Sequence, residues 1–188
     1  MATITLQSTG IDATVAQIGG RLDEATMLQA AGRGISNLVI RHLRRRNSRP
    51  SRPGWPKSNY WERAAGSTQT SIARGEALVA IHAPGIRLRL KGGRVVPRRG
   101  KALAIPARPE VAGVWPSEYS AGGRVFLLVR KALGKAYLVE QQADGHLRIL
   151  WRLVRSTTHK ADSTVLPTRD EIGAAAIAAI LSILPKTK

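Results

Sequence analysis

The spacing of apolar residues divides the chain into extended and helical segments. Residues 2–8 alternate between apolar and polar side chains, which predicts a short strand. A weak helical pattern covers residues 12–19, and a stronger one begins near Glu24, after a possible N-cap at Asp23. Its predicted apolar stripe consists of Leu28, Ala31, Ile35, Leu38 and His42, widened by Val39 and Leu43. Three arginines follow at its C-terminal end, where the helix dipole favours cations.

Two glycines interrupt this long helix. Gly32 and Gly34 each cost a helix roughly 1 kcal/mol relative to alanine. A neighbouring backbone that approaches closely is one reason to have glycine there. We therefore expect another element to pack tightly against this part of the helix.

The rest of the chain contains mostly extended segments. The prolines of residues 47–57 exclude a helix interior, and a short helix capped by Ser58 is expected over residues 59–65. Period-two patterns predict strands over residues 71–74, 77–82, 85–90, 94–96, 125–131, 135–140 and 147–153. Residues 97–121 are predicted to be rich in loops, broken by the apolar residues 102–105, and residues 154–166 form a polar loop.

A capping box opens the last predicted element. Thr168 and Glu171 have the T-x-x-E spacing that begins a helix, here one that ends at Pro185. The order of elements predicts a single α+β domain over residues 1–188, with a curved antiparallel β-sheet packed by the long N-terminal helix and the C-terminal helix. Extended loops are expected at about 47–57 and 97–121.

Positive charge is the unusual property of the composition. The 188 residues include 30 Lys and Arg against 12 Asp and Glu, a formal net charge of +18. Such a balance indicates a polyanionic or acidic partner, although a run of charge is often only a solvated surface. The candidate contacts lie in two basic segments and are Arg44, Arg45, Arg46, Arg87, Arg89, Arg94, Arg98 and Arg99.

Aromatic residues are interleaved with the first basic segment. Trp55, Tyr60 and Trp61 could stack on nucleic-acid bases. We favour a role as anchors that hold the proline-rich segment to the domain or to a neighbouring subunit. Leu103 and Ile105 are further candidate anchors, because they are apolar residues in a region predicted to be a loop.

The sequence does not indicate a catalytic, cofactor or metal site. It has no cysteine, and its four histidines are scattered without metal-ligand spacing. The glycines at 32 and 34 do not complete a dinucleotide-binding motif. The first residues lack the pattern of a signal peptide, and the longest apolar-rich run, residues 174–184, is too short to span a membrane. We therefore expect no enzyme activity, cofactor or membrane partner.

Three stretches resemble a known family. Residues 49–65, from Arg-Pro through Gly-Trp-Pro to Tyr-Trp-Glu-Arg-Ala-Ala, resemble a segment of the small tail-completion and virion-morphogenesis proteins of tailed bacteriophages. Residues 100–107 resemble that family's Gly-Lys-x-Leu-x-Ile-Pro stretch. Residues 150–154, 159–162 and 165–167 resemble its final strand and the loop before its C-terminal helix.

The resemblance implies a structural role. Such proteins are made in the host cytoplasm and form a ring at the head–tail joint or the tail end of the virion, where they contact copies of themselves and neighbouring neck or tail proteins. Sequence-independent contact with packaged DNA is compatible with this role. Whether the chain is a terminator, a stopper or another neck component stays open. The alternative is a basic accessory protein that binds nucleic acid without sequence preference.

Overall fold

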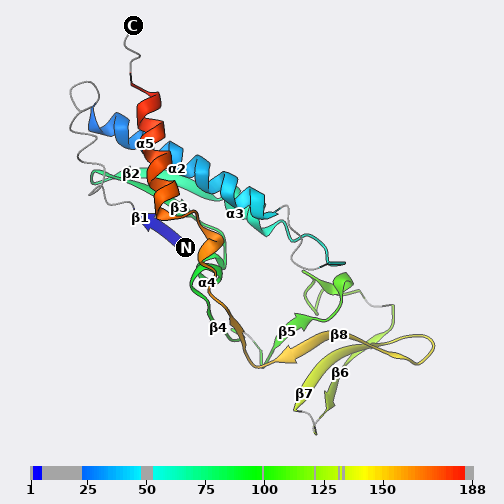
Figure 1. Cartoon of the computed structure of the whole chain (residues 1–188). Helices are drawn as coiled ribbons and strands as arrows, with labels where there is room; N and C mark the ends of the chain where they lie inside the picture. The colour runs from blue at the N-terminus through cyan, green and yellow to red at the C-terminus, as the bar shows by residue number, and fades with distance from the viewer. Residues whose placement is uncertain are drawn as a thin grey trace. The chain divides into compact units, whose positions relative to one another are not determined.

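The computed structural model describes residues 2–5, 23–47, 53–98, 100–120, 122–130, 132 and 134–184 (Figure 1). The expected weak helix at 12–19 lies outside these residues. The chain, expected from its length to be one domain, forms two compact units, which are described one at a time. The first unit comprises Met1–Arg49, Asn59–Gly92 and Lys160–Lys188, and the second comprises Pro50–Ser58 and Gly93–His159. Helices and antiparallel sheets are both present, which confirms the α+β class.

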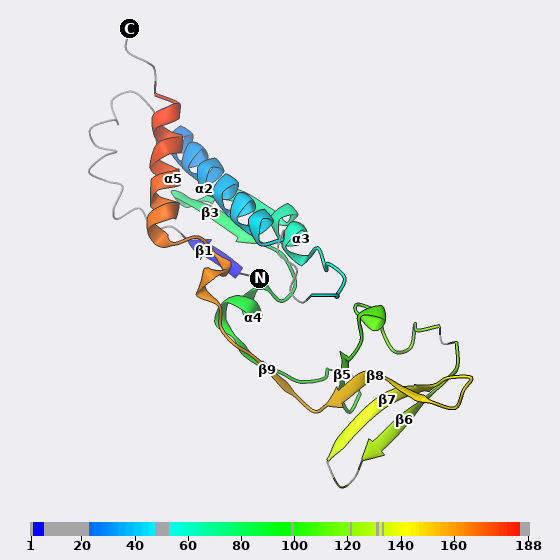
Figure 2. The ribbon, with the colours of Figure 1, turned by 45° about the vertical axis from the view of Figure 1, so that its right-hand side comes forward.

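The first unit packs helices on a small antiparallel sheet. Its strands are β1 (Ala2–Thr5), β2 (Thr68–Ala73) and β3 (Glu76–Ile81), in the order β1-β3-β2. Its helices are α2 (Glu24–Asn47), α3 (Tyr60–Gly66), α4 (Ile86–Lys91) and α5 (Arg169–Ser182). Figure 2 shows α2 and α5 side by side, and β3 lies along α2. The apolar core lies between these elements.

The long helix buries four of the seven residues of the predicted stripe, but the centre of its buried face is rotated from the predicted one. Its buried face runs through Met27, Ala31, Ile35, Val39 and Leu43. The predicted stripe residues Leu28, Leu38 and His42 are only half buried at its flank. The stripe is rotated because two sides of the helix are covered, by the sheet and by α5, and the spacing of apolar residues alone does not say which side is covered more deeply.

Both glycines of α2 face close neighbours, as expected. A Cβ at Gly32 would lie 2.7 Å from the Cγ2 atom of Thr70 on β2. A Cβ at Gly34 would lie 2.6 Å from the main-chain oxygen of Ala175 and from the Cβ of Ala179, both on α5. The glycines therefore set how closely the sheet and α5 approach the long helix.

The predicted strand over residues 85–90 is wrong, because these residues form helix α4. Over six residues, apolar side chains at alternate positions fit a strand and a short helix equally well. Packing decides between them: Ile86 is completely buried, and Leu90, one turn later, packs against the same core. Gly85 precedes the helix with a φ of 79°, which only glycine adopts easily.

The expected helix caps are confirmed at two helices and wrong at the third. Asp23 Oδ1 accepts a hydrogen bond of 2.8 Å from the Thr26 amide at the start of α2. Thr168 and Glu171 form the predicted capping box of α5. Helix α3 starts instead from Asn59, which has a φ of 48° and makes no side-chain cap, so Ser58 is not its N-cap.

The second unit is built on a four-stranded antiparallel sheet in the order β5-β8-β7-β6. Its strands are β5 (Leu103–Pro106), β6 (Arg124–Arg130), β7 (Lys135–Gln141) and β8 (Leu147–Val154). A separate two-stranded ribbon pairs β4 (Gly93–Val95) with β9 (Thr157–His159). The three predicted strands between residues 125 and 153 are confirmed, and the turn at Gly145 has a φ of 81°.

The segment expected as a loop at 97–121 contains more order than predicted. Residues 103–106 form β5, and Pro109–Val111 form a single 3₁₀ turn. The uniformly apolar run around β5 hides its strand character, because alternation is the usual sign of a strand. Only pairing with β8, where Leu103 lies opposite Val154, makes it part of the sheet.

Candidate interaction surfaces

One of the candidate arginines, Arg46, is bound within the first unit. Its Nη2 lies 2.6 Å from a carboxylate oxygen of Asp162, and its Nη1 donates to the carbonyl and hydroxyl oxygens of Thr164, each at 2.8 Å. Its guanidinium also lies over the ring of Trp61, 4.7 Å from the centroid. This fork fastens the end of α2 to the segment that leads into α5, as a bidentate guanidinium is suited to do.

Arg89 on α4 stacks on the aromatic pair of α3. Its guanidinium carbon lies 4.1 Å from the centroid of Tyr60 and 5.2 Å from that of Trp61. The two rings meet edge to face at 5.0 Å, and the Tyr60 hydroxyl donates to the carbonyl of Pro84 at 3.0 Å. Partial burial raises the pKa of this hydroxyl despite the nearby arginine. The pair thus joins α3 to α4 within the first unit.

The remaining candidate arginines are exposed or lie outside the described residues. Arg44 is exposed and forms a surface ion pair of 3.0 Å with Glu62, and Arg45 is exposed beside it. Arg87, Arg94 and Arg98 are also exposed and take part in none of the ion pairs between described residues. The candidate Arg99 is outside the described part of the chain. The available positive surface therefore lies mainly on α2, α4 and the segment around β4.

The apolar anchor candidates outside α3 belong to the second unit. Trp55 is half buried, and Leu103 and Ile105 are half buried on β5. Leu103 and Ile105 occupy alternate positions of the strand and so share one face of the sheet. Whether any of them contacts another subunit stays a prediction.

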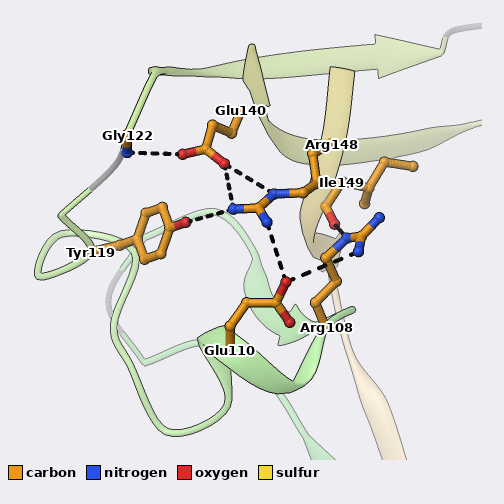
Figure 3. Close-up of polar contacts among 7 residues, drawn as sticks. All are labelled: Arg108, Glu110, Tyr119, Gly122, Glu140, Arg148 and Ile149. Atoms are coloured by element: carbon orange, nitrogen blue, oxygen red, sulfur yellow. Dashed lines mark hydrogen bonds and ion pairs between the residues drawn. The ribbon is translucent and has the colours of Figure 1, made fainter. Parts of the chain in front are cut away.

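A buried carboxylate that the sequence reasoning missed organises the second unit (Figure 3). Glu140 on β7 is 3% exposed and accepts two hydrogen bonds from Arg148 on β8, at 3.0 Å from Nε and 2.7 Å from Nη2. It also accepts from the Gly122 amide at 3.1 Å. The hydrogen bonds to this carboxylate are the main reason that the pKa of Arg148 is raised.

Arg148 extends the same network to the segment before β6. Its guanidinium lies 3.4 Å from the Glu110 carboxylate and donates to the Tyr119 hydroxyl at 3.2 Å. Tyr119 in turn packs edge to face on the buried Trp151 at 5.4 Å. The network therefore holds residues 109–120 against one face of the sheet. The Asp-Gly hairpin places Glu140 opposite Arg148, which is the signal by which the sequence could have revealed the pair.

The sheet of the second unit leaves apolar side chains open to solvent. Leu127 and Val129 on β6 are 56% and 52% exposed, and they share a face because they are two residues apart. Leu147 and Ile149 on β8 are 49% and 37% exposed. By the strand register, these two lie on the opposite face. The core of this unit is small, with Val111, Leu150 and Trp151 at its centre.

The described residues contain no cluster of three or more acidic or histidine side chains that could hold a metal ion. No helix among them is long and apolar enough to cross a membrane. His42, the histidine on the long helix, lies 2.9 Å from the Thr164 carbonyl and so contributes to packing beside Arg46. Comparisons with protein-family models, with curated proteins and with solved structures find no match to this chain.

Proposed function

We propose that the chain is a structural subunit of a bacteriophage neck or tail that forms an oligomeric ring at the head–tail joint or the tail end. Its partners would be copies of itself and neighbouring neck or tail proteins in the virion, with sequence-independent contact to packaged DNA. The proposal assigns it no enzymatic activity. The resemblance of residues 49–65, 100–107 and 150–167 to the tail-completion proteins provides the family expectation.

The open sheet of the second unit is the observation that carries this proposal. A monomer usually keeps one face of an antiparallel sheet polar or covers it with another element. Here Leu127 and Val129 on one face, and Leu147 and Ile149 on the other, are each more than a third exposed. Covering these residues in an assembly would remove apolar surface from water, at about 25 cal/mol for each Å² buried.

The test is the mass of the assembled protein. The purified full chain should form a multimer in native mass spectrometry at micromolar concentration. Substituting serine for both Leu127 and Val129, or for both Leu147 and Ile149, should shift the population toward monomer. Leu181→Ser is the matched control, because Leu181 is 49% exposed on α5 of the first unit. A chain that stays monomeric and does not join phage particles lacking it would overturn the proposal.

The exposed arginines favour the second candidate, a basic accessory protein that binds nucleic acid. Arg87 and Arg94 have no ion-pair partner among the described residues and could contact phosphates. Reversing both to glutamate removes charge without disturbing the stacked Arg89. Tight binding of a monomer or dimer to duplex DNA that weakens steeply with salt, and is lost in this variant, would support the second candidate over the ring.

A further inference from the structure

The outer edge of β6 is open and unusually regular. β6 is the last strand in the order β5-β8-β7-β6, and it pairs with β7 along all seven residues without a bulge. Among the described residues, no strand lies on its other side. An edge of this length, about 23 Å at 3.3 Å per residue, presents a row of unpaired main-chain donors and acceptors.

The two edge strands of this sheet differ in how well they are protected against pairing with another strand. β5 has only four residues and ends in Pro106, and both features discourage pairing with another strand. β6 has neither protection, because it is seven residues long and contains no proline. Its five central residues, Val-Phe-Leu-Leu-Val, are all apolar. The edge strand β2 of the first unit is polar apart from Ile72 and its last residue. Of these three edges, only that of β6 combines seven residues with an apolar centre and no proline.

Uncompensated positive charges flank this apolar edge. Arg124 and Arg130 end the strand and are exposed, and neither forms an ion pair with a described residue. The register places Arg130 opposite Lys135 and Arg124 opposite Gln141. Like charges directly opposite each other on neighbouring strands are destabilising. An acidic group beside Arg130 would relieve this cost, and one beside Arg124 would pair with a charge that no described residue neutralises.

We propose that the open edge of β6 binds, by strand addition, an extended segment of another protein whose apolar centre is flanked by acidic residues. Main-chain hydrogen bonds would provide affinity, and the two ends would select for negative charge. A second copy of β6 is a poor occupant. In the antiparallel register that uses all seven residues, Arg124 of each copy would lie opposite Arg130 of the other. The four-residue edge of β5 is too short to match β6.

The probe is a labelled peptide, acetyl-Glu-Val-Thr-Val-Thr-Val-Glu-amide, titrated with the full chain and followed by fluorescence anisotropy. Its lysine-ended counterpart should bind at least about tenfold more weakly, a difference of about 1.4 kcal/mol. Methylating alternate backbone nitrogens of the acidic peptide should abolish binding, because it removes the donors needed for pairing. The preference should shrink at high salt, since these charges are exposed.

Charge reversal makes the test independent of folding defects. Arg124→Glu with Arg130→Glu should invert the preference, so that the lysine-ended peptide binds more tightly. Arg87→Glu with Lys91→Glu on α4 changes the net charge equally and should leave the preference unchanged. Equal affinity for both peptides, no binding of either, or a wild-type dimer joined through β6 would overturn the proposal. The inference does not rest on the phage proposal, which is tested by the mass of the assembly.

Discussion

Gly34 on α2 lies against the main chain at Ala175 on α5, so that a Cβ at Gly34 would be 2.6 Å from the Ala175 carbonyl oxygen. Real Cβ atoms are essentially never so close to another heavy atom. The obstructing atom belongs to the backbone, which cannot move without displacing the helix. The packing of α5 on α2 therefore depends on the missing side chain at this position.

Gly34→Ala should destabilise the first unit by about 1–3 kcal/mol, because the cost of overpacking exceeds the gain in helix propensity. Gly173→Ala is the control, since Gly173 lies in α5 with no other group within 4 Å of its would-be Cβ. This change should leave stability equal or raise it by up to about 1 kcal/mol. Urea unfolding followed by circular dichroism measures both. Equal effects of the two substitutions would contradict the close approach of the helices.

Removing the buried carboxylate should loosen the second unit. Glu140→Ala leaves the Arg148 guanidinium and the Gly122 amide without their acceptor, at a cost of about 2–4 kcal/mol. Hydrogen exchange should accelerate in residues 109–120, which the network holds to the sheet. Glu62→Ala breaks an exposed ion pair and should cost less than about 1 kcal/mol. Unchanged exchange in Glu140→Ala would show that the network does not hold this segment.

Arg46 should not be replaceable by lysine. Lysine keeps the charge but lacks the planar fork with which arginine binds Asp162 and Thr164 at the same time. It also loses the stacking on Trp61. Arg46→Lys should therefore cost about 1–2 kcal/mol in urea unfolding. Arg41→Lys is the matched change on the same helix, where the Arg41 Nε donates a hydrogen bond of 3.4 Å to the Asn37 carbonyl. It should cost less than about 0.5 kcal/mol.

The capping carboxylate makes the stability of α5 depend on pH. Hydrogen bonds from the Thr168 amide and hydroxyl hold the pKa of Glu171 below its ordinary value of 4.5. A carboxylate with a lowered pKa stabilises the fold fully above its unfolded pKa. This contribution is lost as the pH falls through the folded pKa. The melting temperature of the chain should therefore drop below about pH 4.5.

Glu171→Gln separates this effect from general acid unfolding. Glutamine preserves the geometry of the capping box but does not titrate. The variant should therefore lose less stability than the wild type between about pH 5 and pH 3, the range in which carboxyl groups titrate. The charge repulsion that grows in acid acts on both proteins and largely cancels in the comparison. Identical melting curves across this pH range would exclude a contribution from Glu171.

Local patterns in the sequence determined the elements whose signals lie within a few residues. The caps at Asp23 and Thr168, the strands β6 and β7, and the tight packing at Gly32 and Gly34 were all predicted and are confirmed. Each depends on main-chain geometry or on a short repeat, which acts the same way in any tertiary context. The α+β class follows from their order along the chain.

The tertiary structure decided what a short repeat leaves ambiguous. Residues 86–91 form a helix because Ile86 and Leu90 pack into the same core, although apolar and basic residues alternate along this segment as they would in a strand. Arg46 and Arg89 look like their exposed neighbours in sequence, yet partners distant in the sequence occupy their guanidinium groups. Glu140 is buried because a hairpin brings Arg148 beside it. Burial and pairing depend on which segments meet in space, and one-dimensional spacing does not contain that information.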